Sequence, residues 1–130
     1  MLPDACDPAA SWRSHGVVAP TVELLWWEGC PSTARTRALL AELMAGAGLD
    51  PEELRVAEVV SDEDAERLAF VGSPTIRIDG RDVVPPYPDE PPALSCRVYR
   101  LRDGRPSPVP DPDDIREALR GALGAMEPSP

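Results

Sequence analysis

The chain contains no lysine, and its single histidine, His15, lies in a segment without hydrophobic periodicity. A catalytic pair in which histidine activates a serine or a cysteine is therefore not expected. The basic residues are all arginine, 13 in number, and 23 acidic residues outweigh them to give a net charge of -10. So acidic a surface repels nucleic acid and anionic membranes, and neither is expected as a partner.

Long apolar runs are also absent. No stretch approaches the roughly 20 residues that span a bilayer, and the N-terminus lacks the pattern of a signal peptide. Cysteine is scarce: Cys6, Cys30 and Cys96 are an odd number at wide spacing, which argues against a secreted disulfide framework. The length of 130 residues suits one domain that folds without disulfides or metal ions. We expect a soluble, cytoplasmic protein.

Hydrophobic periodicity and turn residues predict an alternation of strands and helices. Asp79-Gly80, between two short runs, predicts a hairpin with a type I′ turn. Five prolines among residues 85–94 predict an irregular loop that cannot join a sheet. The expected elements are strands 22–27, 55–60, 75–78, 81–84 and 96–101, a helix over 31–47, a turn capped by Asp50, a short helix capped by Ser61 and a final helix capped by Asp111.

Cys30 closes the first predicted strand and opens the helix that comes after it. The first N–H groups of a helix have no partner within the helix, and its N-terminus carries a partial positive charge. Both features favour a thiolate over a thiol, so Cys30 is the candidate reactive atom. The alternative is a buried and inert cysteine at a junction between strand and helix.

Two motifs carry a resemblance to a known fold: Cys-Pro-Ser-Thr at 30–33, after the first strand, and Gly-Ser-Pro-Thr at 72–75, before the hairpin. Together with the order of elements they resemble the thioredoxin fold. The resemblance implies an α/β fold of order β-α-β-α-β-β-α, with a central mixed sheet flanked by helices. Its extent implies a domain over 21–123 that contains a proline-rich insertion at 85–94, a flexible arm at 1–20 and a tail at 124–130.

In the thioredoxin-like family a second cysteine stands where this chain has Thr33. The resemblance therefore implies a site with one attacking cysteine, Cys30, whose thiolate is steadied by the Thr33 hydroxyl. It also implies a cis peptide bond between Ser73 and Pro74, next to which an extended substrate docks. An ordinary trans turn is the alternative, because a cis bond is rare even before proline.

Cys96 comes after the proline-rich loop and is a candidate for the missing second thiol. The loop is long enough to bring it to Cys30, where it would resolve the adduct that Cys30 forms. Arg97 would then lower the pKa of Cys96 or hold an anionic group of the substrate. The alternative is a strand cysteine packed in the core, with Arg97 on the opposite, solvated face. Trp27 would either shape an apolar patch for the substrate or belong to the core.

These residues favour a thiol redox protein that acts through Cys30 on a disulfide, a peroxide or another soft electrophile, with Cys96 as the resolving thiol. Its substrate would be a small-molecule or protein thiol or disulfide, and no nucleotide-binding motif points to a cofactor. A second hypothesis is a carrier in which Cys30 and Cys96 bind Cu(I), Hg(II) or Zn(II). A third is a non-catalytic scaffold whose acidic surface and proline-rich loop bind a protein partner.

Overall fold

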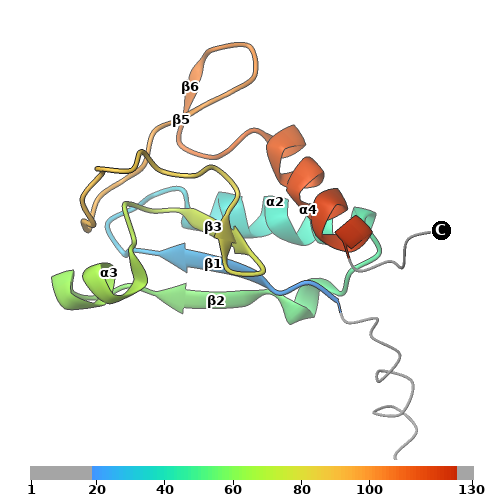
Figure 1. Ribbon diagram of the computed structural model, residues 1–130, viewed down its shortest axis with the longest axis horizontal. Helices are drawn as coiled ribbons and strands as arrows, with labels where there is room; N and C mark the ends of the chain where they lie inside the picture. Colours follow the sequence, from blue (N-terminus) through green and yellow to red (C-terminus); the bar gives the residue numbers. More distant parts are fainter. Residues whose placement is uncertain (1–18, 126–130) are drawn as a thin grey trace, which may run out of the picture.

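The structure, a computed structural model, describes residues 19–125 and is built on a mixed sheet of four strands (Figure 1). The strands lie in the order β2-β1-β3-β4. β1 and β2 run parallel, β3 runs antiparallel to β1, and β4 runs antiparallel to β3. The expected α/β class is therefore confirmed. The strands are β1 (Val22–Trp26), β2 (Arg55–Glu58), β3 (Thr75–Ile78) and β4 (Arg81–Asp82).

Side chains that alternate along β1 divide the core into two parts. Leu24 is fully buried in the larger part, between the sheet and helices α2 and α4, whereas Leu25 packs with Phe70 and with Ala65 of α3. Burying one leucine contributes about 1.5–3 kcal/mol, so the continuous apolar run of β1 holds both layers. The helices are α2 (Thr33–Gly46), α3 (Asp62–Leu68) and α4 (Pro112–Ala125), with a short 3-10 turn, η1 (Pro51–Glu53), before β2 (Figure 1).

Capping residues fix where the shorter elements begin. The Ser61 hydroxyl accepts a hydrogen bond from the Asp64 N–H at 3.1 Å, at the start of α3. The Asp111 carboxylate accepts one from the Asp113 N–H at 2.9 Å, at the start of α4. Asp50 caps η1 in the same way. The predicted caps are confirmed, because each depends on a side chain that bonds to the backbone two or three residues ahead.

The hairpin of β3 and β4 also forms as predicted at its turn, where Asp79 and Gly80 both have positive φ, +53° and +81°. The second strand is shorter than expected and ends at Asp82 rather than at residue 84, with one further backbone hydrogen bond from the Val83 N–H to the Ile76 carbonyl at 2.9 Å. The Val84 carbonyl instead accepts a hydrogen bond from the Arg97 side chain at 2.8 Å, and Pro85 is the next residue. A proline has no N–H with which to continue a ladder.

The prediction of a strand over 96–101 is wrong for most of these residues. Only β5 (Tyr99–Arg100) is paired, with β6 (Pro106–Ser107), a strand that the sequence did not predict because its residues lie among prolines. Cys96 forms an isolated parallel bridge with Ser73 instead. The two-stranded ribbon of β5 and β6 projects from the sheet ahead of α4 (Figure 1).

Helix α2 begins two residues later than expected, at Thr33, with Ser32 as its N-cap and Pro31 in the preceding turn. Cys30 therefore lies just outside the helix, in the connection from β1. At the chain ends, α4 continues to Ala125, beyond the expected domain end at 123. Most of the expected arm, with Cys6 and His15, and the residues from 126 onward lie outside the described part of the chain. Within that part, no helix is long and apolar enough to cross a membrane.

Candidate functional site

Three connecting segments meet beyond the carboxyl end of β1, at the left in Figure 1. They are the connection from β1 to α2, the segment ahead of β3, and residues 93–97, which we call the strap. The first two are tied together by the Trp27 N–H, which donates to the Ser73 hydroxyl at 3.1 Å. Cys30, Ser73 and Cys96 each come from one of the three segments.

Cys30 is held against Ser73 and is 8% exposed. Its N–H donates to the Trp27 carbonyl at 3.0 Å, which closes the turn after β1, and its thiol donates to the Ser73 carbonyl at 3.5 Å. The first backbone hydrogen bond of α2 is donated by Thr36 to Ser32, at 2.9 Å. The N–H groups of the first turn therefore point toward the end of the helix where Cys30 lies, and no acidic residue occupies that turn.

Thr33 does not have the contact expected of it. Its hydroxyl donates to the backbone carbonyl of Cys30 at 3.4 Å rather than to the sulfur. The helix starts at Thr33, so its side chain lies beside the carbonyl three residues back. The expectation that Thr33 steadies a Cys30 thiolate directly is not met in this structure, and its contact instead helps to fix the turn.

The peptide bond between Ser73 and Pro74 is cis, as expected from the resemblance. Ser73 is fully buried, and the Pro74 carbonyl accepts a hydrogen bond from the Tyr99 hydroxyl. Burial raises the pKa of Tyr99 far above its ordinary value, so the hydroxyl keeps the proton that it donates. The segment ahead of β3 is therefore bonded on both sides of this peptide.

The strap pairs with the backbone of Ser73. The Ser73 N–H donates to the Ser95 carbonyl at 2.7 Å, and the Arg97 N–H donates to the Ser73 carbonyl at 2.9 Å. Gly72 makes this approach possible: a Cβ there would lie 2.6 Å from Cγ of Arg97, and its φ is +149°. Only glycine fits such a position without displacing the strap.

Cys96 projects from the middle of the strap and is exposed, and neither it nor Cys30 is in a disulfide. The two side chains interact. Desolvation, together with the smaller effects of the charge and the hydrogen bond of Cys30, raises the pKa of the Cys96 thiol above its ordinary value. The structure thus brings the two cysteines together, as the sequence hypothesis required, through their shared neighbour Ser73.

Arg97 lies in neither of its two expected positions. Its side chain is 8% exposed, and its guanidinium pairs with Asp82 at 3.0 Å, donates to the Val84 carbonyl and lies 4.6 Å from the centre of the Tyr99 ring. A solvated strand face is therefore wrong, and its donors are used inside the protein rather than left open to a substrate. Burial raises the pKa of the Asp82 carboxyl, with the Arg97 charge opposing that shift.

Trp27 is half-buried and packs against the smaller part of the core. Its ring closes over Gly29, where a Cβ would lie 2.3 Å from the ring. The ring also lines a shallow pocket of about 360 Å³ with Val59 and Val60. Trp27 therefore belongs in part to the core, as one of its two interpretations held, and in part to the lining of this pocket.

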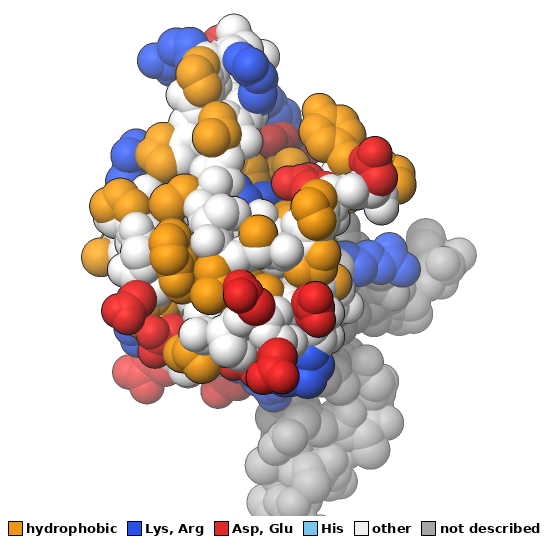
Figure 2. Space-filling view, turned by 90° about the vertical axis from the view of Figure 1, so that its left-hand side faces the viewer, with side chains coloured by type: hydrophobic (Ala, Val, Ile, Leu, Met, Phe, Trp, Pro, Cys, Tyr) orange, Lys and Arg blue, Asp and Glu red, His pale blue; other side chains and the backbone are white. Residues whose placement is uncertain are grey.

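A larger pocket, of about 530 Å³, opens beside Cys96. Two of its lining side chains, Tyr87 and Val98, are 79% and 74% exposed. Figure 2 faces the end of the molecule where β1 points and shows hydrophobic side chains gathered across its middle, with acidic side chains below them. Cys96 therefore borders a hollow of mixed lining, in which Val84, Pro85 and Pro86 are apolar and Glu90, Arg100 and Asp114 are charged.

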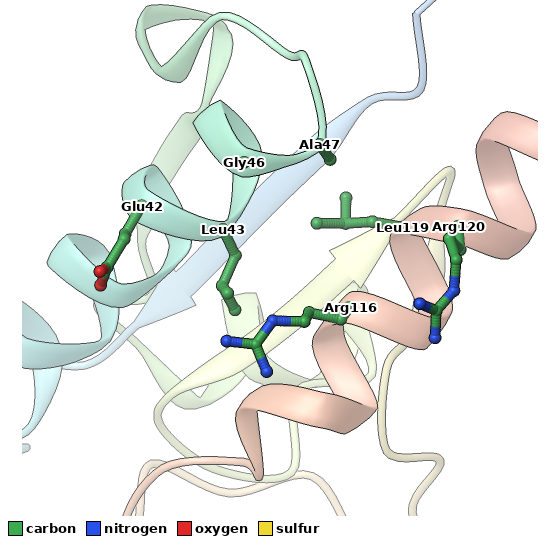
Figure 3. Close-up of a pocket in the computed structure, with 7 residues that line it drawn as sticks. All are labelled: Glu42, Leu43, Gly46, Ala47, Arg116, Leu119 and Arg120. Atoms are coloured by element: carbon green, nitrogen blue, oxygen red, sulfur yellow. The ribbon is translucent and has the colours of Figure 1, made fainter.

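Helices α2 and α4 form another pocket, of about 420 Å³ (Figure 3). Leu43 and Leu119 line it from the two helices, and Arg116 and Arg120 lie along its α4 side (Figure 3). None of its lining residues belongs to the three segments around the cysteines. Among residues 19–125, no three His, Cys, Asp or Glu side chains gather where they could hold a metal ion.

No family model matches this chain, and neither a curated protein nor a solved structure does. The functional interpretation of the site therefore depends on the contacts within this chain. The sequence identified both cysteines and the Ser73-Pro74 bond, but not the roles of Asp82 and Tyr99, which bind Arg97 and the Pro74 carbonyl. Gly72 belonged to the motif at 72–75, but the room that it leaves for the strap was not predicted.

Proposed function

We propose that this protein is a thioredoxin-like thiol redox protein in which Cys30 attacks and Cys96 resolves. The observation that carries the proposal is that both cysteines adjoin Ser73, Cys30 through a hydrogen bond from its thiol to the Ser73 carbonyl and Cys96 through the backbone bridge. The sheet order β2-β1-β3-β4, with Cys30 after β1 and a cis proline before β3, supports the resemblance to the thioredoxin fold.

The two cysteines differ in a way that suits a division of roles. Cys30 lies at the positive end of α2, where a negative sulfur is favoured. Desolvation and, to a smaller extent, the neighbouring Cys30 raise the pKa of the Cys96 thiol, which disfavours its thiolate. A thiolate is the nucleophile in exchange reactions, so Cys30 reacts first and Cys96 second.

The exchange with a disulfide substrate balances in atoms and electrons. The Cys30 thiolate attacks one substrate sulfur, the substrate S–S bond breaks, and the leaving thiolate takes the proton of Cys96. The Cys96 thiolate then attacks Sγ of Cys30 and releases the second half of the substrate as a thiolate. The substrate gains two electrons, the protein ends with a Cys30–Cys96 disulfide, and an external thiol reductant restores it.

The same pair supports a second function, because two adjacent thiolates also bind soft metal ions. A carrier of this kind would hold one ion between Cys30 and Cys96 and complete its coordination with an external thiol. The two functions differ in the step after the first contact. A redox protein exchanges disulfides repeatedly, whereas a carrier binds one ion per pair and leaves the disulfide state unchanged.

Peptide mapping tests the proposal directly, because cleavage after arginine places Cys6, Cys30 and Cys96 in three separate peptides. Reduced protein treated with one equivalent of hydroxyethyl disulfide should yield the Cys30–Cys96 peptide pair. Cys96→Ser should stop at a mixed disulfide on Cys30, and Cys6→Ser, the matched control, should behave like the parent. A parent that accumulates the mixed disulfide unresolved would refute the proposal; tight binding of one Hg(II) per pair without exchange would favour the carrier.

A further inference from the structure

The backbone N–H and C=O groups of Ser73, which lies beside Cys30, are already hydrogen-bonded within the chain. The Ser73 carbonyl that contacts the Cys30 thiol also accepts from the Arg97 N–H, and the Ser73 N–H donates to Ser95. A polypeptide substrate that docks as an added strand needs free main-chain N–H and C=O groups at the edge it joins. At Ser73 the chain's own strap uses both groups, so an extended polypeptide has no edge to join beside Cys30.

Further hydrogen bonds and an ion pair hold the strap in place. Besides its two bonds to Ser73, the Ala93 N–H donates to the Phe70 carbonyl at 2.9 Å, and the Ser95 hydroxyl donates to the Val71 carbonyl at 3.4 Å. At its other end Arg97 is anchored by the buried ion pair with Asp82. Displacing the strap would separate this buried ion pair, which is strongly unfavourable because it leaves both charges buried without compensation.

Access to the pair remains open at Cys96, which lines the pocket of about 530 Å³, whereas Cys30 does not line it. A volume of this order is typical of sites for small molecules, which range over about 300–1,000 Å³. Two exposed hydrophobic side chains, Tyr87 and Val98, stand among its walls. Charge does not select a substrate here, because the pocket contains Glu90 and Asp114 as well as Arg100.

We infer that the substrate of the Cys30–Cys96 pair is a low-molecular-weight disulfide that enters through this pocket, and not a disulfide within an extended polypeptide. The inference rests on the proposed function and narrows its substrate class. The strap closes the side on which a polypeptide would pair, and the pocket admits a compact molecule whose apolar arm contacts Tyr87 and Val98.

The test compares the reduced protein with N-acetylcysteine as a free reference thiol, using hydroxyethyl disulfide and insulin as oxidants. We expect the ratio of the two rate constants, small disulfide over insulin, to exceed the reference ratio at least tenfold. Val98→Trp, which fills the pocket, should slow the small disulfide at least threefold. Ala45→Trp, an exposed position near the far end of α2, is the matched control and should leave that rate unchanged.

The outcomes separate the two proposals. Equal ratios for protein and reference, or no effect of Val98→Trp, overturn the substrate class while the Cys30–Cys96 peptide pair still forms. If neither oxidant yields that pair in the peptide map, the proposed function fails and the substrate class fails with it. A rapid reaction with insulin would mean that the strap leaves Ser73 readily, contrary to the contacts that hold it.

Discussion

Replacing Gly72 with alanine tests whether the strap is held against Ser73 as described. The added Cβ would lie 2.6 Å from Cγ of Arg97, 3.2 Å from its backbone N and 3.3 Å from the Ser95 carbonyl oxygen. Carbon atoms in contact are normally about 3.5–4.0 Å apart, so the Arg97 stem has to move by roughly 1 Å. The guanidinium is fixed by Asp82 and Val84, so this movement strains or breaks the ion pair.

Two costs add in the Gly72→Ala variant. A residue other than glycine at φ +149° costs about 1–3 kcal/mol, and overpacking costs about 1–3 kcal/mol more. We expect the free energy of unfolding to fall by about 2–6 kcal/mol, a large part of the stability of an ordinary domain. Gly80→Ala is the matched control, because Gly80 has φ +81° but no atom within 4 Å of its added Cβ. It should cost only about 1–2 kcal/mol.

Urea unfolding of the two reduced variants measures these losses, and titration against glutathione measures the pairing of the thiols. In Gly72→Ala the strap should move Cys96 away from Cys30, so we expect the equilibrium constant for their disulfide to fall at least tenfold. Gly80→Ala should leave that constant unchanged. The account of the strap is refuted if Gly72→Ala costs no more than Gly80→Ala, or if it leaves the disulfide equilibrium as it is in the parent.

Two further predictions concern the charges at the site. Asp82→Ala leaves the buried Arg97 guanidinium without its counter-charge, so the free energy of unfolding in urea should fall by about 3–5 kcal/mol. Asp82→Leu combined with Arg97→Met should recover most of this loss, and a loss below about 1 kcal/mol in Asp82→Ala would contradict burial of the pair. Cys30→Ala removes a charge and a hydrogen bond that raise the pKa of Cys96. The pH midpoint of Cys96 alkylation by iodoacetamide should therefore move to lower pH, and an unchanged or higher midpoint would contradict the interaction of the two cysteines.

The parts of the fold that were predictable depend on residues close together in the sequence. Asp79-Gly80 requires only its own positive φ angles, and Ser61 and Asp111 cap N–H groups two or three positions ahead. The apolar run of β1 identifies a strand buried on both faces for the same reason. Prediction failed where pairing joins distant segments: nothing within residues 96–101 indicates that Cys96 bridges to Ser73, so a longer strand was expected there.

The candidate site divides in the same way. Cys30 could be singled out because its neighbours in the sequence place it between a strand and a helix. The position of Arg97 could not, because it depends on Asp82, in a hairpin whose sequence gives no sign of a buried carboxylate. An arginine beside a cysteine therefore suggested a substrate-binding group, while tertiary structure used it to anchor the strap.

The separation of the two cysteines, 66 positions, has an energetic consequence for the proposed redox cycle. In a Cys-x-x-Cys motif the local backbone keeps both thiols together; here only folding does so, through the Ser73 bridge and the Arg97–Asp82 pair. In the chain-entropy account a disulfide closing such a loop stabilises the folded state by about 4 kcal/mol. Because linkage is reciprocal, folding favours the disulfide by the same amount, so a change that loosens the strap weakens thiol pairing and fold stability together.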